Sequence, residues 1–369
     1  ADADTKVQVE ESSDEDKIRF DTGGTERVII DSSGITMSSG TINGVGISSN
    51  ITNFANSILI SNDAGTGTLD AATKNTGLGW EVFDDITTAD GNTGLGYQAL
   101  TKLTTAPFNT ALGRSSLATT TIGDGRNTAV GYQSLTALTT GNNNVGVGMN
   151  AGATITTATK NVVVGSLSGD ALTEGSENVA VGYDALGADT LGSNCVAVGP
   201  SALRTQNFTT ATSAMNTAVG SFAMYANTTG INNTAIGRSA LQVNTTGAEN
   251  VAVGTYSLDA NTTADGSTAI GYAALSTNSG ANNTAVGRRA LDANTTGIDN
   301  VALGANALDS NTTANDNVAV GRYALQAVTT SADNVAVGSS ALYNNTGASN
   351  TAVGRSALLA NTTGTFNTA

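Results

Sequence analysis

Tyrosine and arginine side chains recur at one place in a repeat of about 17 residues, each directly after a glycine. Aromatic rings stack on sugar rings, and guanidinium groups hydrogen-bond to acidic or hydroxyl groups. An edge carrying both could therefore bind a glycan, anionic glycans included. The alternative is that these side chains only cover strand ends or bridge neighbouring chains. The candidates are Tyr97, Arg114, Tyr132, Tyr183, Arg238, Tyr272, Arg288, Arg322 and Arg355.

The chain lacks the side chains that most enzymes use for catalysis. It contains no histidine, which excludes Ser-His-Asp and Cys-His nucleophile systems and histidine-bearing zinc sites. Its one cysteine, Cys195, cannot form a disulfide within the chain, and we expect a small buried side chain rather than a reactive thiol. Two carboxylates alone can hydrolyse a glycoside, but with 30 Asp and Glu a close pair is weak evidence. We therefore expect no enzyme, no metal site and no cofactor.

Charge and hydropathy exclude several classes of binding partner. The formal net charge of −15 disfavours nucleic acid and anionic membrane surfaces. No stretch approaches the roughly 18 apolar residues that a spanning helix needs, so we expect no membrane insertion. Only 4% of residues are aromatic and 12% are charged, which argues against a thick globular core. Because "FNTA" at the end reads as the start of another repeat, we expect the polypeptide to continue beyond residue 369.

A tandem repeat occupies residues 75–369, and its period predicts the fold. Segments such as "NTAVG" begin eighteen times, and thirteen of the seventeen intervals are 17 residues long. Numbering each repeat from 0 at this Asn, position 2 is Ala or Gly except at Val163, position 3 is Val, Ile or Leu, and position 8 is usually Leu. Period-two alternation of β-branched and small residues is typical of strands, and "NTTG" is typical of turns. We predict an all-β parallel β-solenoid, or β-roll, with two short strands in each coil.

Each position receives an expected role in this solenoid. Val or Thr at position 1 and Val, Ile or Leu at position 3 should face the lumen, where position 3 meets the Leu of position 8. Ala at position 2 and Gly at position 4 should face the other way and permit close backbone approach, across a narrow lumen or against another chain. Asn at position 0 should form a ladder of stacked amides, interrupted at Cys195 and Ser267. The glycines of position 4 include Gly131, Gly182, Gly237, Gly287, Gly321 and Gly354.

Residues 1–74 differ from the array. Residues 1–15 are an acidic lead-in, expected to be solvated rather than a cation site, and 16–74 are a fibre segment of strands and hairpins. Within the latter, residues 17–21 and 26–31 alternate as strands around a Thr-Gly-Gly-Thr turn, and a further strand is expected at 34–37.

Two resemblances follow from these motifs. "NTAVG", "NVAVG" and "STAIG" resemble the head repeats of YadA-type trimeric autotransporter adhesins, over residues 75–369, although the family's repeats are usually shorter. That resemblance implies a trimeric, left-handed parallel β-roll on a bacterial surface. "TERVIIDSSGITM" is similar to segments of bacteriophage tail fibres. That resemblance implies a shaft that holds a host-binding tip away from the virion.

The expected function is therefore the structural shaft of a phage tail fibre, located in the virion tail and contributing to host attachment. Its expected partners are two further copies of itself in a homotrimer, other tail proteins, and a glycan or protein of the host surface. The alternatives are a bacterial surface adhesin or extracellular filament and, less favoured, a polysaccharide-degrading tailspike. The 21-residue interval after Cys195 predicts a protruding loop over residues 204–215, a second candidate for recognition. Adjacent Thr pairs argue against ice binding because they would point to opposite faces of a strand.

Overall fold

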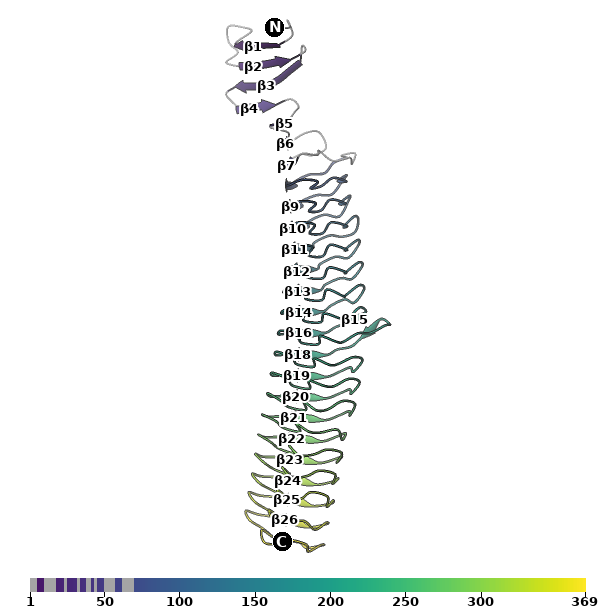
Figure 1. The fold of residues 1–369 in the computed structure, drawn as a ribbon, viewed down its shortest axis with the longest axis vertical. Coiled ribbons are helices and arrows are strands. Elements are labelled where there is room, and N and C mark those ends of the chain that lie inside the picture. The colour runs from purple at the N-terminus through teal and green to yellow at the C-terminus, as the bar shows by residue number, and fades with distance from the viewer. Residues whose placement is uncertain are drawn as a thin grey trace.

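The structure, a computed structural model, describes residues 5–9, 18–22, 25–31, 34–37, 41–42, 45–49, 57–61 and 70–369. The described residues form strands and turns without a helix, and most of them stack into a long rod (Figure 1). The strands are β1 (Thr5–Val9), β2 (Ile18–Thr22), β3 (Thr25–Asp31), β4 (Gly34–Met37), β5 (Thr41–Ile42), β6 (Val45–Ser49), β7 (Ile58–Ser61), β8 (Thr76–Leu78), β9 (Thr93–Leu95), β10 (Thr110–Leu112), β11 (Thr128–Val130), β12 (Val145–Val147), β13 (Val162–Val164), β14 (Val179–Val181), β15 (Gly192–Ser193), β16 (Val196–Val198), β17 (Thr212–Ser213), β18 (Thr217–Val219), β19 (Thr234–Ile236), β20 (Val251–Val253), β21 (Thr268–Ile270), β22 (Thr284–Val286), β23 (Val301–Leu303), β24 (Val318–Val320), β25 (Val335–Val337) and β26 (Thr351–Val353).

Strands β1 to β4 form an antiparallel sheet at the N-terminal end. Strands β2, β3 and β4 match the three predicted strands to within one residue at each end. Strand β1 was not predicted: it lies within the expected acidic lead-in and pairs with β2 in an antiparallel register. The acidic residues 10–16 lie outside the described residues.

The rest of the chain is a parallel β-solenoid. Strands β5, β6 and β7 pair antiparallel, and from β7 onward each strand of the array pairs in parallel with the next, equivalent positions side by side. The stack begins one layer before residue 75, because β7 pairs in parallel with β8 and the Asn75 N–H donates to Ser57 Oγ over 2.8 Å. At about 4.8 Å per coil, seventeen coils span on the order of 80 Å.

Each regular coil contains one three-residue strand at positions 1–3, not the two strands expected. The remainder is a series of turns that are nevertheless hydrogen-bonded between coils, as where Leu241 N–H donates to the Ser257 carbonyl over 2.9 Å. The leucines of position 8, such as Leu241 and Leu291 with φ of 53°, adopt the left-handed conformation, which an extended strand cannot contain. A run of small residues followed by Leu therefore marks a turn here.

The core also contradicts the expected facing of the strands. Ala at position 2 is fully buried, as at Ala235 and Ala252, and it packs in the same core as the buried position-8 leucines Leu241 and Leu258. Positions 1 and 3 point outward, so Val253 is only half-buried. The lumen is narrow, and in nearly every coil position 8 places a large side chain in the core shared with the strand, so position 2 must be small.

The exception at Val163 follows from the same volume limit. Val163 is the one valine at position 2 and lies in the core, while position 8 is glycine in its own coil and in the preceding one, at Gly169 and Gly152. A Cβ built on Gly152 would lie 3.1 Å from Val163 Cγ2, and one on Gly169 would lie 2.8 Å from Val163 Cγ1. The valine therefore fills space that leucine fills elsewhere.

Position-4 glycines bring successive coils together along the rod axis. Their φ angles lie between +130° and +142°, and a Cβ built on Gly237 would lie 2.7 Å from the carbonyl carbon of Gly254. Close approach was predicted, but its direction was wrong: the neighbour is the next coil, not the opposite wall or another chain.

Two ladders of buried amides run through the core. The ladder at position 0 was predicted, and in it the Asn250 N–H donates to Asn233 Oδ1 over 2.9 Å. The Asn of "NTT" at position 11 forms a second, unpredicted ladder, with Asn244 Nδ2 donating to Asn227 Oδ1 over 2.9 Å. Position 11 is apolar in most coils before Asp189 and mostly Asn from Asn227 onward, so the rod has two kinds of interior.

Candidate functional site

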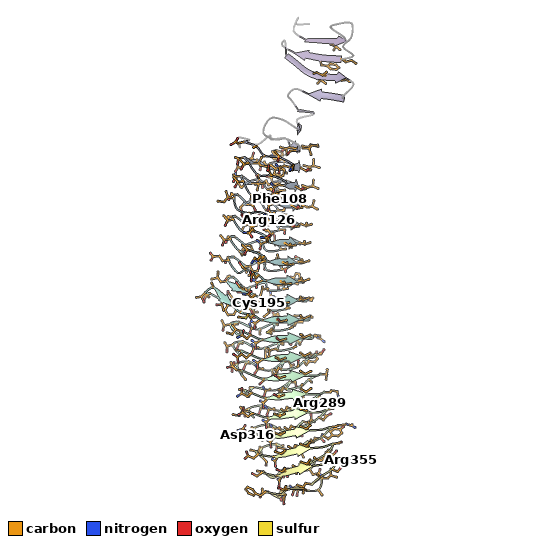
Figure 2. All side chains as sticks on the ribbon, turned by 180° about the vertical axis from the view of Figure 1, so that it is seen from behind. Phe108, Arg126, Cys195, Arg289, Asp316 and Arg355 are labelled. Atoms are coloured by element: carbon orange, nitrogen blue, oxygen red, sulfur yellow. The ribbon has the colours of Figure 1, made fainter. Side chains whose placement is uncertain are left out.

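The tyrosines and arginines that follow the position-4 glycines lie along one edge of the rod, just beyond the strand ends. Figure 2 labels Arg289 and Arg355 on this edge and Asp316, which lies just before β24, on the opposite edge. The side chains are well exposed, with Tyr183 at 57% and Tyr272 at 52%. The sequence reading thus identified a shared, accessible edge.

Along much of this edge the side chains stack on one another. The Arg114 guanidinium lies 5.5 Å from the ring centre of Tyr97 and 5.6 Å from that of Tyr132. The Arg322 guanidinium lies 4.4 Å from the ring centre of Tyr323. Such cation–π pairs hold the edge in place and occupy the ring faces that a sugar would need. These members support the alternative in which the side chains cover the strand ends.

In the C-terminal half of the array the edge is hollowed. The hollow has a volume of about 460 Å³ and lies over three successive coils. Tyr272 and Arg288 come from the predicted series, whereas Asp259 and Asp292, at position 9, were missed. The residue type at position 9 varies between coils, and only the folded turn shows that this position lies beside positions 5 and 6. The residues that line the hollow are Tyr256, Asp259, Tyr272, Ala273, Ser276, Arg288, Arg289 and Asp292.

The 21-residue coil carries the predicted protrusion. Strands β15 and β17 pair in parallel and project from the side of the rod (Figure 1). Phe208 is buried at the base of the insertion, whereas residues 209–211 are exposed. The loop therefore has its own anchor, and its exposed residues include Asn207, Thr209, Thr210 and Ser213.

Beneath the insertion lies a buried polar cluster around Cys195. Gln206 Nε2 donates to Asp189 Oδ2 over 2.6 Å and lies 3.2 Å from Cys195 Sγ. Asn216 Nδ2 donates to Gln206 Oε1 over 2.8 Å, so Gln206 rejoins the amide ladder that Cys195 interrupts. Burial raises the pKa of the Asp189 carboxyl, opposed by the hydrogen bond from Gln206. The cluster is enclosed, and its polar groups pair with one another.

Cys195 is expected to be unreactive while the rod is folded. The residue is fully buried, and burial raises the pKa of its thiol to about 11, so little thiolate exists at pH 8. We expect a chromogenic disulfide reagent at pH 8 to modify it only after unfolding in denaturant. Stoichiometric modification of the native protein within minutes would contradict the buried position.

The described residues contain no group of three or more acidic, Cys or His side chains arranged to hold a metal ion. No helix among them is long and apolar enough to cross a membrane. No protein-family model, curated protein or solved structure matches the chain. Any function must therefore be inferred from the chain's own residues and geometry.

Proposed function

We propose that this chain is the structural shaft of a bacteriophage tail fibre, located in the virion tail, which contributes to host attachment and performs no chemistry. The observation that supports this is the parallel, in-register stack of coils. Each coil adds about 4.8 Å and contacts only its neighbours, so the number of repeats sets the length of a stiff rod. A spacer of defined length is what a fibre shaft requires. Its proposed partners are other tail proteins and a glycan or protein of the host surface.

An antibody raised against the repeats tests the location. We expect it to label tail fibres on virions, and purified protein to form straight rods whose repeat array is on the order of 80 Å long. Labelling of the envelope of uninfected bacteria would favour the alternative, a surface adhesin or extracellular filament of the same fold. Shortening of host surface polysaccharide by the purified rod would instead favour a tailspike enzyme.

We further propose that copies associate side by side through the outward sheet face, as a homotrimer. This face presents Val, Thr, Leu and Ile at positions 1 and 3 along the whole array, with Ile236 and Ile270 exposed by 41% and 40%. Three strand residues are about 10 Å wide, so 80 Å of rod offers about 800 Å² of sheet face on each copy, which in a trimer is shared between its two neighbours. Of the positions that were expected to make this contact, Ala at position 2 is inside the coil and Gly at position 4 faces the next coil.

Lysines on this face test the association. We expect the double substitution Ile236→Lys and Ile270→Lys to lower the association state to monomer, because both charges would be buried against the partner. The matched control is Val243→Lys, since Val243 is 38% exposed but lies off the sheet. Sedimentation velocity reports the mass. A monomeric wild-type rod, or a double variant with unchanged mass, would contradict the proposal.

A further inference from the structure

The hollow around Tyr272 presents an aromatic face that the neighbouring side chains hold in place. Tyr256 meets the Tyr272 ring edge-on, with 6.3 Å between ring centres and an interplanar angle of 83°. The Arg238 guanidinium lies 5.6 Å from the Tyr256 ring centre and fixes that ring in turn. The small side chain of Ala273 follows Tyr272 in the same coil and leaves space beside its ring. A fixed, exposed ring loses little conformational freedom when a ligand stacks on it.

Polar groups in the hollow are only partly satisfied by the protein. Asp259 is half-buried: its Oδ1 is enclosed, which leaves Oδ2 as the oxygen that faces the hollow, and burial raises the pKa of this carboxyl to about 6. Arg288 has neither an ion pair nor a side-chain hydrogen bond to any described residue. Arg289, in contrast, is held by Asp292, with 2.7 Å between Nε and Oδ2. One acceptor and one donor are therefore available beside the ring.

The charges of the hollow balance. Two arginines, Arg288 and Arg289, face two carboxylates, Asp259 and Asp292, and Arg289 also lies 3.9 Å from Asp309, so an anionic ligand gains nothing from the site as a whole. The net charge of −15 on the chain further disfavours an acidic polymer. A neutral ligand rich in hydroxyl groups satisfies both an unpaired acceptor and an unpaired donor, because a hydroxyl can do either.

We propose that this hollow binds a hexose unit of an uncharged saccharide. The apolar face of the sugar packs on Tyr272, one hydroxyl donates to Asp259 Oδ2, and another accepts from Arg288. The volume of about 460 Å³ lies within the range of small-molecule sites. This binding names a ligand class for the attachment function proposed above and rests on it. The anionic glycans anticipated from the sequence fit this hollow less well.

A second hollow on the same edge provides an internal control. It has a volume of about 410 Å³ and also combines a tyrosine, a half-buried carboxylate and an arginine: Tyr183, Asp170 and Arg204. Its arginine is already engaged, since Arg204 pairs with Asp184 and its Nη1 donates to Tyr225 Oη over 2.8 Å. Two of the three nitrogens of its guanidinium are therefore already engaged, unlike those of Arg288, and we expect it not to bind.

The experiment measures binding of labelled oligosaccharides to the full chain by fluorescence anisotropy at pH 7.5. The probes are gluco-, manno- and galacto-oligosaccharides as neutral ligands and oligogalacturonate as the acidic one. We expect at least one neutral probe to bind with a Kd of about 0.1–1 mM. Tyr272→Ser and Arg288→Ser, which introduce the residue found at this position in other coils, should each weaken it about tenfold. Tyr183→Ser is the matched control and should change it less than twofold.

Three results would overturn the saccharide site. They are no binding of any neutral probe up to about 10 mM, binding of oligogalacturonate alone, and equal losses in Tyr272→Ser and Tyr183→Ser. Thermal melting of each variant verifies that the exposed substitutions leave the rod folded. Straight rods on virions without saccharide binding would reject this site and leave the shaft function standing. Saccharide binding by a chain that the antibody does not find on virions would reject the shaft function and leave this site standing.

Discussion

Replacing Gly287 with valine is expected to divide the solenoid into two segments that unfold independently. Gly287 has φ of +138°, and a Cβ there would lie 2.6 Å from both the carbonyl carbon and the carbonyl oxygen of Gly304. These neighbours are backbone atoms of the next coil and cannot move aside without losing the ladder between β22 and β23. We expect the local free energy of unfolding to fall by more than about 4 kcal/mol, a loss typical of severely disruptive core substitutions.

Because coils interact only with their neighbours, the damage should stay local. We expect Gly287→Val to melt in two steps, with new proteolytic cleavage close to residues 287–304 and protected coils on either side. Circular dichroism during heating and mass spectrometry of the fragments report these two outcomes. A single transition within two or three degrees of the wild type would show that coil stacking tolerates a side chain there.

The control for Gly287→Val is Gly266→Asn, which places the residue found at Asn282 at an equivalent left-handed position inside the array. A Cβ on Gly266 would lie 2.7 Å from Asn282 Oδ1, the end of a side chain rather than backbone. This variant should unfold in a single step, like the wild type.

The sequence predicts the period, the strand at "NTAVG", the first amide ladder and the burial of Cys195, because each depends on a residue type at a fixed spacing. It does not predict which face of the strand is inside. The alternation of residues has period two whichever face of the strand is inside. Only the volume available in the lumen decides whether position 2 or positions 1 and 3 are buried. Val163 carries that information, since a large residue occurs at position 2 only where position 8 is glycine, at Gly152 and Gly169.

The second ladder and the hollow were missed for a related reason. Asn in "NTT" suits both a turn and a buried amide, and the two differ only in the direction of the side chain. The hollow combines positions 5, 6 and 9 of three coils, and the left-handed residues at positions 6 and 8, such as Tyr256 and Leu258, bring these positions together. Extended-strand geometry, which was assumed for this segment, would separate them.

Replacing Asn250 with aspartate is expected to destabilise the rod at neutral pH and to do so less in acid. Asn250 Oδ1 accepts the Ser267 N–H over 2.9 Å, and its Nδ2 donates to the Ala264 carbonyl over 2.8 Å. Aspartate retains the acceptor but places a second oxygen against that carbonyl in a fully buried position. We expect a cost of about 3 kcal/mol or more at pH 7, from the lost bond and the buried charge.

The pH dependence distinguishes this cause from simple loss of packing. Burial, with the Ala264 carbonyl facing the second oxygen and only the Ser267 N–H as donor, should raise the pKa of the new carboxyl above its unfolded value of about 3.9. The folded state then binds more protons than the unfolded state, so the penalty is smallest near pH 4 and grows as the pH rises toward 7. Protonation also restores a donor to the Ala264 carbonyl. Because wild-type carboxyls titrate in the same range, as at Asp259, the variant must be compared with the wild type at each pH.

Hydrogen exchange at the Ser267 amide measures this penalty locally, which suits a rod that need not unfold in one step. We expect Asn250→Asp to exchange much faster than the wild type at pH 7, and the ratio of the two opening constants to shrink toward pH 4. Asn250→Ser is the control, because the array itself places Ser267 at this position and serine does not titrate there. It should raise exchange by a factor that is independent of pH. If the loss of stability in Asn250→Asp were also independent of pH, the ladder would tolerate a buried charge. Its amides would then stabilise the rod through packing rather than through hydrogen bonds.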